Sequence, residues 1–160
     1  MRYITGILFF GLFSLSCVHA SPVRVAPDFT WVDASGKTQS TKNFKGKPIV
    51  ILIAPNAKDW HFRAQVGAVQ ERYERLSAMG ALFIAAFTEE STRIRSNVPF
   101  IIASDGPNVG YLYDISKGAG IAIIGKDGNL DYVTNKIIPG QRIMDVINNS
   151  EANQEKLRRE

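Results

Sequence analysis

The chain has 160 residues, of which 19 are Lys or Arg and 15 are Asp or Glu, and it contains a single cysteine. The formal net charge of +4 is small for this length, and the basic residues are interleaved with acidic ones. Nucleic-acid-binding proteins concentrate positive charge in runs or patches, so this composition argues against nucleic acid as the main partner. One cysteine also excludes an internal disulfide, so the fold must be stabilised by packing.

Residues 1–20 have the pattern of a secretory signal peptide. Arg2 provides a basic start, an apolar run of about a dozen residues follows, and the "VHA" triplet provides a cleavage site after Ala20. The apolar run is short for a membrane span, and none is predicted. We therefore expect an exported protein, periplasmic or extracellular, whose mature chain begins at Ser21 and contains no cysteine.

An alternative interpretation of the N-terminus involves Cys17, the only cysteine of the chain. In a lipoprotein signal this cysteine would be acylated and would anchor the protein to a membrane. Ser14 stands three positions earlier, where such signals have an aliphatic residue. Either signal leaves residues 21–150, enough for one domain with its own core, and residues 151–160, which predict a polar tail.

The apolar runs predict a series of short strands. A weak strand at residues 28–32 precedes a turn at "DASGK". Runs that are apolar throughout predict strands buried on both faces at residues 49–54, 81–87, 100–103 and 121–124. Asp127 and Gly128 form a two-residue hairpin signal that connects the last of these to a strand at residues 130–134.

Helices are predicted between these strands. The longest has apolar residues at spacings of four and three, namely Phe62, Val66, Val69, Tyr73 and Leu76. Shorter helices are predicted at residues 88–97, begun by Thr88, and at residues 107–115, where Pro107 suits the first turn. A final helix at residues 139–149 presents Ile143, Val146 and Ile147 to the sheet. This order predicts an α/β sandwich with a mixed sheet.

Several short sequence segments, in this order, resemble segments of the thioredoxin-like superfamily. The resemblance is strongest to its secreted redoxins of the peroxiredoxin and cytochrome-maturation type. "APDFTWVDASGKTQSTKNFKGKPIVILIA" is similar to the opening of these proteins, and "RAQVGAVQERY" to the helix after their redox motif. "SDGPNVGYLYDI" and "IAIIGKDGNL" resemble the segment that returns across the domain and the hairpin. The resemblance implies a thioredoxin-like three-layer sandwich with a mixed central β-sheet flanked by helices.

The same resemblance places the two redox cysteines of the family near Asp59 and Phe62. Neither a carboxylate nor a phenyl ring can replace a thiolate, which attacks a disulfide or a peroxide. The family also has a cis-proline before the hairpin, and here "SKGAG" brings Gly118 or Ala119 to that place. Both parts of the redox apparatus are therefore missing.

The residues that replace the redox motif have structural and functional interpretations. Asp59 is predicted to be a helix N-cap, and an acid–base pair with His61 is the alternative. Trp60 is either a packing residue or an exposed binding anchor. Lys58 and Arg63 are either solvated charges or part of a site for a small anion or an acidic peptide.

The sequence thus predicts an exported, cysteine-free and redox-inactive domain with a binding or structural role in the cell envelope. Its partner would be an envelope protein or an extended peptide. The candidate surface at the former redox site consists of Lys58, Asp59, Trp60, His61, Gly118, Ala119 and Gly120.

The only other histidine is His19, in the predicted signal peptide, so no histidine-based metal site and no cofactor are predicted. The alternative function is that of an enzyme or accessory protein of thiol or peroxide metabolism. Such a protein would act through a partner or through non-thiol chemistry at Asp59 and His61.

Overall fold

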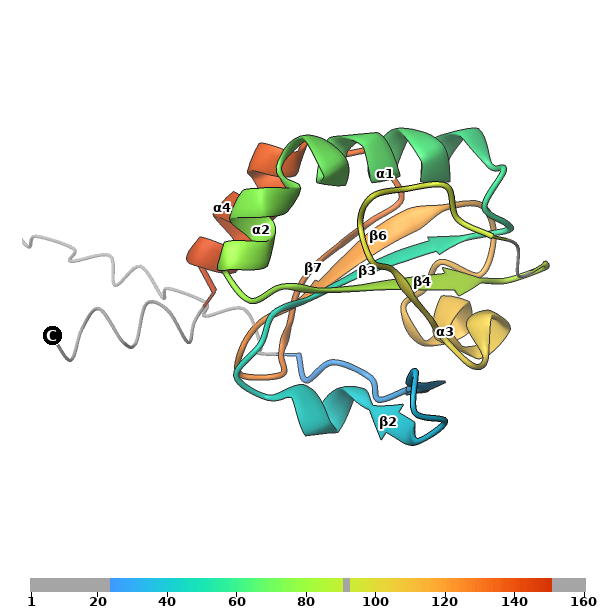
Figure 1. Ribbon diagram of the computed structural model, residues 1–160, viewed down its shortest axis with the longest axis horizontal. Coiled ribbons are helices and arrows are strands. Elements are labelled where there is room, and N and C mark those ends of the chain that lie inside the picture. Colours follow the sequence, from blue (N-terminus) through green and yellow to red (C-terminus); the bar gives the residue numbers. More distant parts are fainter. Residues whose placement is uncertain (1–23, 91–92, 151–160) are drawn as a thin grey trace, which may run out of the picture.

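The computed structural model describes residues 24–90 and 93–150, in which a mixed β-sheet lies between two layers (Figure 1). The spatial order of its strands is β5-β4-β3-β6-β7. They are β3 (Ile49–Ala54), β4 (Leu82–Phe87), β5 (Ile101–Ile102), β6 (Gly120–Ile124) and β7 (Leu130–Thr134). The predicted α/β sandwich is confirmed, whereas the predicted signal peptide and polar tail lie outside the described residues.

Different elements cover the two faces of the sheet. One face carries the helices α1 (Trp60–Glu71), α2 (Tyr73–Ala78) and α4 (Gly140–Asn148), which lie above the sheet in Figure 1. As predicted, α4 directs Ile143, Val146 and Ile147 into the core on that side. The other face carries α3 (Gly106–Leu112), the 3-10 helix η1 (Thr41–Phe44), and a small antiparallel sheet of β1 (Thr30–Val32) and β2 (Thr38–Ser40).

The central strand β3 contributes to the cores on both faces, because successive side chains of a strand point in opposite directions. All six of its residues are buried. Leu52 packs in the same core as Phe62 of α1, and Ile51 packs in the core that contains Trp31 and Tyr113. Burial of each such aliphatic side chain contributes roughly 1.5–3 kcal/mol. β3 therefore packs against the layers on both faces of the sheet.

The long helix predicted from Phe62 onward is interrupted at Arg72, where φ is −118° and ψ is 12°. α1 ends before this residue and α2 begins after it. In the second segment Leu76 is buried, and the ring of Tyr73 lies 5.7 Å from the ring of Phe83 in β4. The apolar spacing continues through the interruption, so the pattern by itself predicts one helix.

The prediction of a helix at residues 88–97 is wrong, because the described residues of this segment are not helical. The backbone N–H of Thr88 donates to the carbonyl oxygen of Ala54 at 2.9 Å. Those of Glu89 and Glu90 both donate to the carbonyl oxygen of Pro55 at 3.1 Å. These bonds prolong the contact between β4 and β3 and hold the chain against the end of β3 where a helix would have to begin.

The strand predicted at residues 100–103 lies at the edge of the sheet rather than in its centre. β5 is short and half-buried, and it pairs in parallel with β4. An N-terminal segment partly covers this edge, since Trp31 forms a bridge with Ala103 and the N–H of Ser104 donates to the carbonyl oxygen of Thr30 at 3.0 Å. This cover explains why an edge strand has the apolar pattern of a central one.

The predicted turn signals are confirmed. Gly128 of the hairpin has a φ of 85°, which a glycine adopts without strain. Helix α3 begins after Asp105, whose Oδ1 accepts a hydrogen bond from the N–H of Asn108 at 3.0 Å. Pro107 occupies its first turn, as predicted.

The carboxylate of Asp28 connects the N-terminal segment to η1. Its Oδ1 accepts hydrogen bonds from Ser40 Oγ at 2.6 Å and from Thr41 Oγ1 at 2.5 Å. Lys42 Nζ lies 3.4 Å from Asp28 Oδ2. Burial raises the pKa of this carboxyl, but the hydrogen bonds from Ser40, Thr41 and Lys42 outweigh it and hold the pKa below its ordinary value.

We expect Asp28→Asn to lower the free energy of unfolding at pH 7 by about 1–2 kcal/mol, because the amide lacks the charge that strengthens these bonds. The pKa is lower in the folded than in the unfolded protein. The stabilisation is therefore present above the unfolded-state pKa of about 3.9 and is lost as the pH falls through the folded-state pKa. Urea denaturation at pH 7 and pH 3 measures this, and the difference should shrink at pH 3.

The matched control is Asp114→Asn, since Asp114 makes an exposed ion pair with Arg24 at 3.6 Å. Exposed pairs contribute little, so this variant should change the stability by less than about 0.5 kcal/mol. A loss for Asp28→Asn that is the same at both pH values would contradict the assignment.

Candidate functional site

The position that the sequence resemblance assigns to the redox motif lies where the central strand passes into α1. β3 ends at Ala54 and α1 begins at Trp60. The Oδ1 atom of Asp59 accepts a hydrogen bond from the N–H of Phe62 at 3.0 Å. The carbonyl oxygen of Asp59 also accepts from the N–H of Arg63 at 3.0 Å. The predicted N-cap is confirmed, and the carboxylate satisfies an N–H group that has no partner within the helix.

Phe62, near the second redox position, is part of the core. Its side chain is 2% exposed. Its ring centroid lies 5.2 Å from that of Phe87 and 6.3 Å from that of Phe100, in an aromatic group beneath α1. Such ring pairs contribute to stability beyond the area they bury. This position therefore serves packing.

Trp60 points away from this core and is 65% exposed, so its interpretation as a packing residue is wrong. Residues two apart on a helix point in nearly opposite directions, which separates Trp60 from Phe62. The ring of His61 lies 4.3 Å from the ring of Trp60, with 44° between the planes. His61 thus packs on Trp60, while the carboxylate of Asp59 caps the helix.

The structure divides the predicted surface into two parts. His61, Ala119 and Gly120 line one small cavity of about 10 Å³, which is close to the smallest volume that holds a water molecule. Lys58 lines a different and much larger groove beside α1. Gly118 is exposed and has a φ of 80°.

Gln65 is a buried polar residue that the sequence analysis missed. Its Nε2 donates to the carbonyl oxygen of Ile138 at 2.9 Å, and its Oε1 accepts from the N–H of Ile138 at 2.8 Å. This pair of bonds fixes α1 to the segment that precedes α4. A polar residue in the apolar stripe of a helix was the available signal, because buried polar groups require partners.

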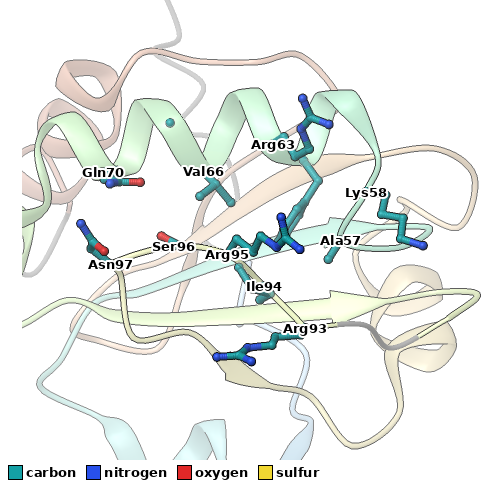
Figure 2. Close-up of a pocket in the computed structure, with 12 residues that line it drawn as sticks. Ala57, Lys58, Arg63, Val66, Gln70, Arg93, Ile94, Arg95, Ser96 and Asn97 are labelled. Carbon is teal, nitrogen blue, oxygen red and sulfur yellow. The ribbon is translucent and has the colours of Figure 1, made fainter.

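The larger groove lies between α1 and residues 93–97, and its volume is about 1210 Å³ (Figure 2). Lys58 and Arg63, which the sequence suggested for an anion site, line it from the α1 side. Arg93 and Arg95 line it from the opposite segment, and the sequence analysis missed both. In "RIR" basic and apolar side chains alternate, which is typical of an extended chain and would place both arginines on the same side. The segment was instead expected to be helical.

Neither a metal centre nor a membrane span is found in the part of the chain that the structure describes. Within residues 24–90 and 93–150, no group of three or more His, Cys, Asp or Glu side chains could hold a metal ion. None of the helices in these residues is long and apolar enough to cross a bilayer.

Comparison with known proteins shows which family the sequence matches. Residues 22–133 match the AhpC/TSA family. The chloroplastic peroxiredoxin Q of Triticum aestivum is 31% identical over 97 residues, which cover 58% of this chain and 45% of the wheat protein. The chain spans about half the length of the curated relatives it matches.

Solved structures show the same fold at low identity. A thiol:disulfide interchange protein from Bacteroides sp. has a TM-score of 0.61 and 18% identity, covering 85% of this chain and 96% of that protein. Peroxidoxin BcpB from Mycobacterium tuberculosis has a TM-score of 0.56 and 14% identity, with coverages of 79% and 93%. The expected thioredoxin-like fold is confirmed.

The cap assignment predicts how two substitutions at the same position differ. Asp59→Asn should retain the stability of the protein, because asparagine caps a helix about as well as aspartate. Asp59→Ala should lower the free energy of unfolding by about 0.5–2 kcal/mol, since the N–H of Phe62 loses its acceptor. Urea denaturation of the two variants measures both effects, and unchanged stability in Asp59→Ala would refute the cap.

Proposed function

The chain belongs to the AhpC/TSA family, and from this premise we propose that it is an exported member in which binding has replaced thiol chemistry. Its place of action would be the cell envelope. Its fold is the one on which the family builds its redox site, and a fold can keep its surface when its chemistry is lost.

The observation that carries this proposal is the use made of the two redox positions. Asp59 caps α1, and Phe62 is buried in the core. The only cysteine of the sequence is Cys17, within the predicted signal peptide. Reduction of a disulfide or of a peroxide by this family needs a thiolate, which neither position can supply.

A binding role is supported by the side chains exposed around the start of α1. Trp60 packs against His61 at the rim, where an aromatic side chain is a common anchor for a partner. Lys58 adds a positive charge next to this pair. The alternative of non-thiol chemistry has less support, because Asp59 and His61 are engaged in separate contacts.

We expect the purified full chain to show no turnover above background in insulin reduction with dithiothreitol or in consumption of hydrogen peroxide. The variant Cys17→Ser is the control for any thiol activity of the N-terminal segment. Activity that persists in Cys17→Ser would contradict the proposal, and its loss in Asp59→Asn or His61→Ala would then assign it to the alternative chemistry.

The proposed export predicts a mature chain that begins at Ser21. Intact-mass measurement of the protein recovered from the envelope and periplasmic fractions of its native host tests this. A mass that corresponds to an acylated Cys17 would replace the secreted form by a lipoprotein. An uncleaved chain in the cytoplasmic fraction would refute export.

A further inference from the structure

The groove beside α1 is formed by two walls that are far apart in the sequence. The first wall is the N-terminal part of α1, with Arg63, Val66 and Gly67, preceded by Lys58. The second wall is the segment of residues 93–97, which runs opposite the helix (Figure 2). This cavity is large compared with pockets for small molecules, which usually have about 300–1,000 Å³.

The second wall is attached to the core by apolar side chains. After it, Val98 is buried, and its N–H donates to Ser96 Oγ at 3.0 Å. Ile94 packs against the core beneath α1. Ile94 and Val98 therefore fix this wall to the core, although its described residues form no helix or strand.

The charge of the groove is of one sign. Lys58, Arg63, Arg93 and Arg95 line it, and no acidic side chain is among its lining residues. The ion pairs found in residues 24–90 and 93–150 involve Arg24 and Lys42, both outside the groove. Basic side chains gathered along one groove repel one another and create a positive potential, which favours an anionic ligand.

The remaining lining residues indicate what else the ligand carries. Phe62, Val66 and Ile94 provide an apolar floor. Polar side chains at the far end, Gln70 and Asn97, can accept and donate hydrogen bonds. An inorganic anion would occupy a small part of this volume and would not contact the floor. An extended peptide of several residues can place carboxylates at the basic rim and an apolar side chain on the floor.

We propose that this groove binds an extended acidic segment of a partner protein. The guanidinium groups of Arg63, Arg93 and Arg95 receive its carboxylates, because their planar donors match carboxylate oxygens in pairs. An apolar side chain of the segment rests on Phe62, Val66 and Ile94. This inference rests on the proposed binding role and assigns to it a ligand class and a surface.

The test uses fluorescein-labelled decapeptides and the full chain, with binding measured by fluorescence anisotropy. The first peptide alternates Glu with Leu, the second alternates Gln with Leu, and the third alternates Glu with Ser. The first should bind more tightly than either of the others, and its affinity should fall as sodium chloride increases, because salt screens the exposed charges. Equal binding of the first two peptides would overturn the proposal.

Charge variants locate the site. Arg93→Gln with Arg95→Gln should weaken binding of the first peptide by about tenfold or more, since two charge-assisted contacts are lost. The matched control is Lys37→Gln with Lys47→Gln, which removes the same charge from exposed positions outside the groove. An equal loss in both double variants would show a general charge effect and would overturn the proposal.

A steric pair tests the same groove without a change of charge. Apart from the neighbouring residues and backbone of α1 itself, no atom of the described residues lies within 4 Å of a Cβ placed on Gly67, so Gly67→Tyr fills the groove with little disturbance of α1. Ala64→Tyr adds the same side chain at an exposed position of α1 that does not line the groove. Gly67→Tyr should abolish peptide binding, and Ala64→Tyr should leave it within about twofold. Circular dichroism and thermal unfolding establish that each variant is folded.

Other ligands give distinct results. Displacement of the peptide by millimolar inorganic phosphate would reduce the groove to a simple anion site and overturn the proposal. Binding to phosphatidylglycerol vesicles without binding to the first peptide would also overturn it. Peroxidase turnover in a protein whose groove variants lose peptide binding would refute the proposed function alone. An inactive protein that binds no acidic peptide would refute this inference alone.

Discussion

The burial of β3 on both faces is the constraint on which the rest of the structure depends. Its residues alternate between two cores, so a displacement of this strand would disturb both layers at once. The end of β3 also determines where α1 begins. The carbonyl groups of Ala54 and Pro55 then receive the segment that leaves β4. One strand therefore positions the start of α1 and the beginning of the segment that leaves β4.

The start of α1 is stabilised by side chains that are not thiols. A redox centre keeps a thiolate accessible at a helix N-terminus, where the partial positive charge of the helix lowers its pKa. In this protein the same helix end is satisfied by the carboxylate of Asp59, and Phe62 fills the core below it. Both side chains contribute to stability, and neither has the chemistry of a thiol. Trp60, which is exposed and packs on the half-buried His61, keeps the rim available for contact.

The basic groove shows why net charge is a weak guide to binding. A charge of +4 over 160 residues suggests no particular partner. The fold nevertheless brings Lys58 and Arg63 opposite Arg93 and Arg95 without an acidic side chain among the lining residues. Local potential depends on this arrangement rather than on the sum of charges. A protein of low net charge can thus gather several positive charges along one groove.

The sequence by itself determined the α/β sandwich, the central strand and the cap at Asp59, because apolar periodicity and capping are local properties. It also determined the absence of a thiol at the redox positions. Only the tertiary structure decided that β5 lies at the sheet edge, that the segment before it is not helical, and that Trp60 is exposed. It also decided that Arg93 and Arg95 line the groove beside α1. The physical reason is that these features depend on long-range contacts, such as the bonds to Pro55, which local patterns do not contain.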